Sequence, residues 1–171
     1  MTYQSDIAGW HDFYLTCGSA SAALVGLLFV GLSLHIRVVV TNPDVRSLAR
    51  VTLTNFVDVL LVSLFLVSPS QSSSAAGLEL IIVCVVSLGL IIRPAVDGVR
   101  QRKTLTLRVL ISRFAFSALG YAAIAAGGVL LLEGAYDSAL QAMLATVIGL
   151  LVIAVRNTWD LLVTVSDRSA A

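Results

Sequence analysis

The chain has 171 residues, of which 58% are hydrophobic and 12% are charged, with a net charge of +1 and a mean hydropathy of +0.95. These values lie outside the range of soluble domains, so they argue against a soluble enzyme and against a nucleic-acid-binding protein. Since a membrane-spanning helix needs about 20 apolar residues, a chain of this length can form about five spans joined by short loops.

A short amphipathic helix is expected before the first span. Four large side chains recur there at helical spacing on one face: Tyr3, Ile7, Trp10 and Tyr14. Trp and Tyr favour the boundary between lipid and water, so this segment is predicted to lie at the outer membrane interface. Five apolar runs then predict spans over about 15–38, 48–67, 78–92, 107–132 and 139–162, with a kinked helical extension of the third through Arg100 as the alternative. The expected fold is an all-α transmembrane bundle that forms a single domain over residues 1–171.

Small residues recur at every fourth position in two of the predicted spans. The first span carries Gly18, Ala22 and Gly26, and the fourth carries Ala118, Ala122 and Ala126. Hydrophobic burial does not drive helices together in lipid, and small side chains allow the close backbone approach that favours association. Both ladders are therefore predicted to line helix interfaces.

Residues 41–44 (TNPD) are predicted to form a turn with helix-start chemistry before the second span. That span contains Asp58, the only acidic residue in the middle of a predicted span. A charge at that depth costs about 2.5 to 3.5 kcal/mol on insertion scales, so Asp58 needs a partner or a proton. Arg113 in the fourth span is the expected ion-pair partner. Asn55, one helical turn before Asp58, is positioned to donate a hydrogen bond to it. This set is interpreted as a polar clasp between helices or as part of an ion or proton pathway.

A single topology places all eleven Lys and Arg residues on one side of the membrane. Cytoplasmic loops retain basic residues, so the N-terminus is predicted outside and the C-terminus in the cytoplasm. The most basic segment contains Arg100, Arg102, Lys103 and Arg108. It is expected to fix the topology, with contacts to anionic lipid headgroups or to protein as the alternative. Arg156 and Asp160, four residues apart near the inner end of the fifth span, are predicted to form an interfacial ion pair.

Motifs for hydrolysis, nucleotide binding and metal binding are missing from the sequence, and His11 and His35 lie near opposite ends of the first span. We therefore expect no catalytic residue, metal or cofactor. The leading hypothesis is a non-enzymatic subunit or regulator that acts through helix contacts in a homo-oligomer or membrane complex. The alternative is a homo-oligomeric ion channel or small transporter that uses the polar residues within the membrane. A membrane enzyme or cofactor carrier is the third possibility.

Two stretches near the N-terminus, residues 10–14 (WHDFY) and 22–31 (AALVGLLFVG), carry a resemblance to known sequences. Together they resemble small multi-span bacterial membrane proteins of uncharacterised function, over about the first fifth of the chain. Some of those sequences are labelled as modulators of a membrane-embedded ATP-dependent protease. The resemblance implies a location in the bacterial inner membrane, and it transfers no catalytic residues.

Overall fold

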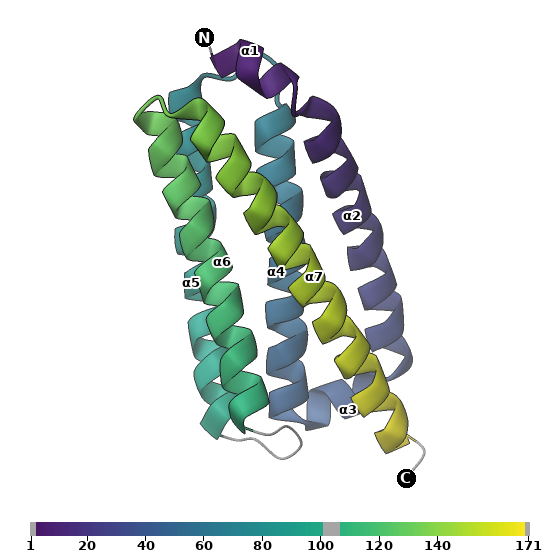
Figure 1. Cartoon of the computed structure of the whole chain (residues 1–171). Helices are drawn as coiled ribbons and strands as arrows, with labels where there is room; N and C mark the ends of the chain where they lie inside the picture. The colour runs from purple at the N-terminus through teal and green to yellow at the C-terminus, as the bar shows by residue number, and fades with distance from the viewer. Residues whose placement is uncertain (1–2, 101–106, 170–171) are drawn as a thin grey trace.

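A computed structural model describes residues 3–100 and 107–169 of the chain. This part of the chain contains seven helices and no strand (Figure 1). The five long helices are α2 (His11–Leu34), α4 (Pro43–Val67), α5 (Ser73–Arg100), α6 (Leu107–Leu132) and α7 (Tyr136–Ser169). The two short helices are α1 (Tyr3–Ala8) and α3 (Ile36–Thr41). The long helices lie side by side, with α1 at one end of the bundle and α3 at the other.

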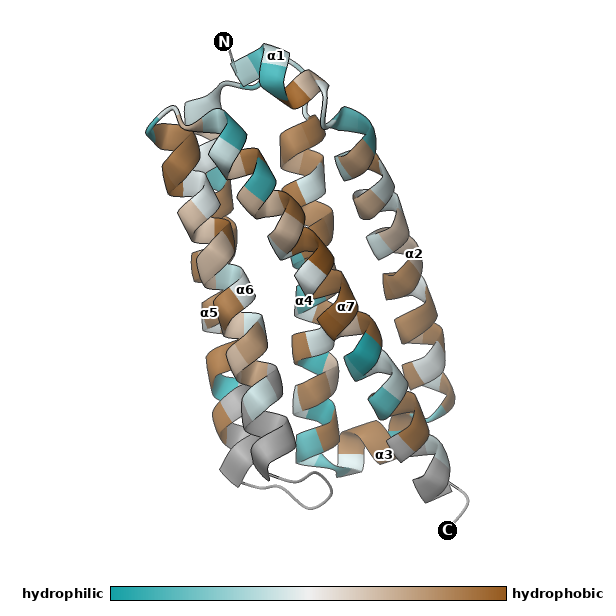
Figure 2. Cartoon of the chain, viewed as in Figure 1, coloured by the Kyte–Doolittle hydropathy of each residue, from teal (hydrophilic) through white to brown (hydrophobic). Residues whose placement is uncertain are grey.

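Each long helix contains a segment that is long and apolar enough to cross a membrane. These segments are His11–Leu34, Pro43–Val67, Ser73–Arg93, Phe114–Leu132 and Tyr136–Val163. Figure 2 shows hydrophobic residues, in brown, along the length of the long helices, and hydrophilic residues, in teal, on α1 and at the start of α2. The protein is therefore an integral membrane protein, and the predicted all-α bundle is confirmed.

One helix end differs from the predicted spans. The backbone leaves the helical path at His35, where φ is −127° and ψ is 29°, so α2 ends at Leu34 and a separate helix, α3, follows. The third long helix continues through Pro94 to Arg100, which agrees with the extension given as the alternative for this span. Helix α4 begins at Pro43, within the predicted helix-starting turn, because proline is well suited to the first position of a helix.

The core of the bundle forms around α4. Half of the residues in its most apolar stretch are buried, against 22% to 39% in the other four spans, and α4 packs against α2, α5 and α7. Two hydrogen bonds attach α2 to its neighbours: the Ser21 hydroxyl donates to the Phe56 carbonyl of α4 at 2.6 Å, and the Tyr14 hydroxyl donates to the Leu140 carbonyl of α7 at 3.1 Å. Helix α2 is therefore tied to α4 and α7 by buried polar contacts.

Helices α5 and α6 approach closely where a glycine from each meets the other. A Cβ atom added to Gly77 of α5 would lie 2.6 Å from the carbonyl oxygen of Gly128, and one added to Gly128 would lie 2.6 Å from the carbonyl oxygen of Gly77. No side chain fits at such distances, so only glycine allows this contact.

The short helix α1 covers one end of the bundle and packs against α7 (Figure 1). Tyr3 is buried and its ring lies edge-on to that of Tyr136, with the ring centroids 5.6 Å apart. The Gln4 amide donates to the Gln71 carbonyl at 2.6 Å. Burial raises the pKa of Tyr3, and the nearby charge of Glu79 adds to the increase. The apolar face predicted for this segment thus contacts protein at Tyr3.

Candidate functional site

Five buried polar side chains form hydrogen bonds between α4, α5 and α6: Asn55, Asp58, Ser87, Ser117 and Tyr121, each no more than 3% exposed. The Ser87 hydroxyl of α5 donates to Asp58 Oδ1 at 2.6 Å. The Asn55 amide donates to the Ser117 hydroxyl of α6 at 2.9 Å. The Tyr121 hydroxyl, also of α6, donates to Asn55 Oδ1 at 2.6 Å. These bonds hold α4 against α5 and α6 inside the apolar bundle.

Asn55 and Asp58 serve different helix interfaces. They are three residues apart, so their directions around α4 differ by about 60°. Asn55 reaches α6 and Asp58 reaches α5. The hydrogen bond expected from Asn55 to Asp58 is therefore replaced by one from Asn55 to Ser117. Within the described part of the chain, Asp58 Oδ2 is buried and has no hydrogen-bond partner.

Asp58 and Ser87 line a groove of about 450 Å³ between α4 and α5. The rest of the lining is almost entirely apolar and includes Val57, Leu61 and Phe65 of α4, and Ile82, Val86 and Leu90 of α5. The three α5 residues are exposed on the outside of the bundle. In a membrane this side of the groove faces lipid, and the carboxyl group lies at its floor.

For the other polar residues predicted as a site, the predicted ion pairs and contacts stay predictions. Arg113 lies on α6, but its side chain is outside the described residues, so its ion pair with Asp58 stays a prediction. The predicted basic segment of Arg100, Arg102, Lys103 and Arg108 also falls outside the described part of the chain. Arg102 and Lys103 are not among the described residues, and the side chains of Arg100 and Arg108 are not described. Arg156 is exposed and Asp160 is half-buried, one turn apart on α7, and their ion pair also stays a prediction.

The small residues of α2 have two different environments. Gly18 is buried against α4, where an added Cβ would lie 2.9 Å from the Cβ of Ser63. Ala22 and Gly26 are exposed, and a Cβ added to Gly26 would have no neighbour within 4 Å. In the described chain, the interface predicted for this ladder is therefore present at Gly18, while Gly26 faces outward.

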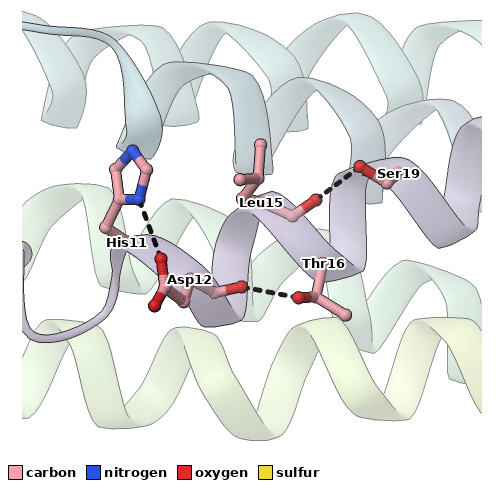
Figure 3. A network of polar contacts seen from close by, with 5 residues as sticks. All are labelled: His11, Asp12, Leu15, Thr16 and Ser19. Carbon is pink, nitrogen blue, oxygen red and sulfur yellow. Dashed lines mark hydrogen bonds and ion pairs between the residues drawn. The ribbon is translucent and has the colours of Figure 1, made fainter.

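A groove of about 200 Å³ runs between α2 and α4, and its lining includes Gly18, Ala22 and Ser63. Ser63 is 2% exposed, and its hydroxyl has no hydrogen-bond partner among the described residues. The nearby Ser19 hydroxyl of α2 already donates a hydrogen bond within its own helix. In Figure 3, Ser19 donates to the Leu15 carbonyl at 2.8 Å, one turn earlier in the same helix.

The same close-up shows the polar start of α2 (Figure 3). The Thr16 hydroxyl donates to the Asp12 carbonyl at 2.7 Å, and His11 Nδ1 lies 3.3 Å from Asp12 Oδ1. These contacts are made within α2 itself and involve no neighbouring helix. Any close packing against the outer face of α2 would therefore depend on its shape.

The alanine ladder of α6 also lies mainly on the outside. Ala118 is half-buried, and Ala122 and Ala126 are exposed. The close contacts of α6 with α7 are made by two glycines instead: a Cβ added to Gly120 would meet the side chain of Leu150, and one added to Gly127 would meet Met143.

Ser87, Ser117 and Tyr121 were missed as partners of the polar residues on α4. Hydroxyl groups inside apolar spans are a signal for hydrogen bonds between helices, but the sequence contains many of them. In the described residues, no group of three or more His, Cys, Asp or Glu side chains could hold a metal ion.

No known protein family, curated protein or solved structure matches this chain.

Proposed function

We propose that the protein is a non-enzymatic subunit or regulator of a membrane complex, and that it acts through contacts between α2 and another transmembrane helix. The observation that carries this proposal is the exposure of α2. Only 22% of its most apolar stretch is buried, the lowest share of the five spans, and small residues occupy part of its outer face. A helix of this kind has a surface suited to a further helix.

The groove beside α2 supports the same interpretation. Small residues at Ala22 and Gly26 allow the backbone of a second helix to approach, and packing at close range is a main source of helix association in lipid. The buried Ser63 hydroxyl lines this groove, and an acceptor on the second helix would satisfy it. The second helix belongs to another copy of this chain or to a different subunit, and the two sources make the same chemical contact.

We also propose that the protein resides in the bacterial inner membrane, with the α1 end outside and the α3 end facing the cytoplasm. Arg37 in α3, Arg46 near the start of α4 and Arg93 at the end of the third span support this orientation. They lie toward the α3 end, and basic residues are retained in the cytoplasm. At that face they are placed to contact anionic headgroups. The resemblance of residues 10–14 and 22–31 to bacterial sequences supports the location.

The proposal is tested by cross-linking in native membranes, followed by purification in mild detergent and mass measurement. Gly26→Leu is the test variant. Gly89→Leu is the matched control, because Gly89 is a glycine within the α5 span and an added Cβ there also has no neighbour within 4 Å. We expect Gly26→Leu to lose the cross-linked species and Gly89→Leu to keep it.

The mass of the cross-linked species tells a second copy of this chain from a different subunit. A wild-type protein recovered only as a monomer would contradict the proposal. So would two variants that retain the cross-linked species equally.

A homo-oligomeric ion channel or small transporter is the second candidate. The buried polar cluster on α4, α5 and α6 favours it, since ionisable groups within a membrane often mark ion or substrate pathways. Flux into liposomes should then depend on Asp58 and Arg113. Flux that is unchanged in Asp58→Ala and in Arg113→Ala would remove the basis of this candidate.

A further inference from the structure

We infer that the groove between α4 and α5 binds a lipophilic organic cation, whose charge is neutralised by the Asp58 carboxylate. This inference names a ligand class for the polar site of the second candidate function. It concerns binding alone, so it holds without transport and without the contacts proposed for α2.

The Asp58 carboxyl group, which lines the groove, has one oxygen atom without a hydrogen-bond partner in the described part of the chain. Asp58 is 1% exposed, and its Oδ1 atom accepts the hydrogen bond from Ser87. Its Oδ2 atom is buried and has no partner in the described part of the chain. A buried carboxylate is stable only when a positive charge or further donors compensate for its loss of water.

The composition of the groove argues against a metal ion. Apart from Asp58, its polar lining residues are Ser87 and Thr54. The Ser87 hydroxyl donates to Asp58, and the Thr54 hydroxyl donates to the Arg50 carbonyl of its own helix at 3.0 Å. Magnesium and calcium take about six to eight oxygen ligands. The groove offers too few oxygens for such an ion.

An organic cation with apolar groups fits both parts of the groove. Its apolar groups would contact walls such as Leu61 and Phe65, and its charge would lie near the buried Asp58 carboxyl group at the floor of the groove. The volume of about 450 Å³ is within the range of small-molecule sites, about 300 to 1,000 Å³. Ile82, Val86 and Leu90 are exposed on the open side, so the ligand would enter sideways from the lipid.

The experiment measures equilibrium binding of radiolabelled tetraphenylphosphonium, a lipophilic cation, to the full chain in lipid nanodiscs. Binding to empty nanodiscs is subtracted, and folding of each variant is checked by thermal unfolding. Asp58→Asn removes the charge at nearly constant volume, so we expect binding at least about tenfold weaker than in the wild type.

A second pair of variants tests the groove without changing its charge. Val86→Phe adds bulk to a residue that lines the groove, whereas Val85→Phe adds the same bulk to an adjacent exposed residue that does not. We expect Val86→Phe to weaken binding and Val85→Phe to bind as the wild type does. If Asp58→Asn does not fold, this pair still decides the question.

Equal affinity of the wild type and Asp58→Asn would overturn the inference, as would equal affinity of the two phenylalanine variants. Absence of binding above empty nanodiscs in the wild type would also overturn it. None of these outcomes bears on the cross-linking of α2, so the inference and the proposed function fail separately.

Discussion

The contact between Gly77 and Gly128 makes the packing of α5 and α6 open to a quantitative test. In Gly128→Ala the new Cβ would begin 2.6 Å from the Gly77 carbonyl oxygen, whereas such carbon and oxygen atoms rest at about 3.3 to 3.6 Å. The two helices must therefore separate by about 0.7 to 1.0 Å, because the obstructing atom belongs to the backbone. We expect a loss of about 1 to 3 kcal/mol in the free energy of unfolding, as in other overpacked cores.

The sign of this effect distinguishes it from helix propensity. Alanine is favoured over glycine in a helix by about 0.5 to 1 kcal/mol, so an unobstructed site should respond in the opposite direction. Gly89→Ala provides this control, since its added Cβ has no neighbour within 4 Å. The assay is titration with SDS in mixed micelles, followed by circular dichroism. A Gly128→Ala protein as stable as Gly89→Ala would refute the close contact.

Three further predictions concern charge, pH and topology. If Asp58 and Arg113 form a fully buried pair, which is the alternative to a cation bound in the groove, Asp58→Ala and Arg113→Ala should each destabilise the protein by about 3 to 5 kcal/mol, and the double variant by less than their sum. Strictly additive losses of thermal stability would mean that the two side chains do not meet. Burial raises the pKa of Tyr3 above its unfolded value of 10.0, so its stabilising contribution is complete below pH about 10 and is lost as pH rises through the folded pKa. Thermal unfolding in alkaline buffers should show a smaller loss of stability in Tyr3→Phe than in the wild type, and identical profiles would contradict this. Finally, Ser72→Cys should react with an impermeant thiol reagent on intact cells and Thr41→Cys only after permeabilisation, whereas the reverse pattern would invert the proposed orientation.

The sequence was sufficient to predict the five membrane segments, because long runs of apolar residues with few charges are typical of helices that cross a bilayer. It did not predict the end of α2 at Leu34, where a single backbone conformation at His35 starts a new helix. Helix ends depend on local dihedral angles, and hydropathy carries little information about them.

The candidate site was predicted in part, for a related reason. Asp58 was identified because a lone acidic residue within a span is costly. Ser87 could not be identified as its partner, since the rotation of α5 about its axis decides which residues face α4. The spacing of Gly18 and Gly26 likewise indicates a shared side of α2, but only the arrangement of the whole bundle shows that Gly18 meets α4 and Gly26 meets no neighbour.

The hydrogen bond from Tyr14 to the Leu140 carbonyl has a consequence for the biogenesis of the protein. Among the five spans described here, that of Tyr14 leaves the ribosome before that of Leu140. The two groups can meet only after the start of α7 has been synthesised. Until then α2 can pack against α4 alone, and the Tyr14 hydroxyl must find a temporary acceptor in headgroups, water or an insertion factor. Synthesis of α7 therefore completes the attachment of α2, so a chain stopped before α7 would hold this helix through α4 without the Tyr14 hydrogen bond.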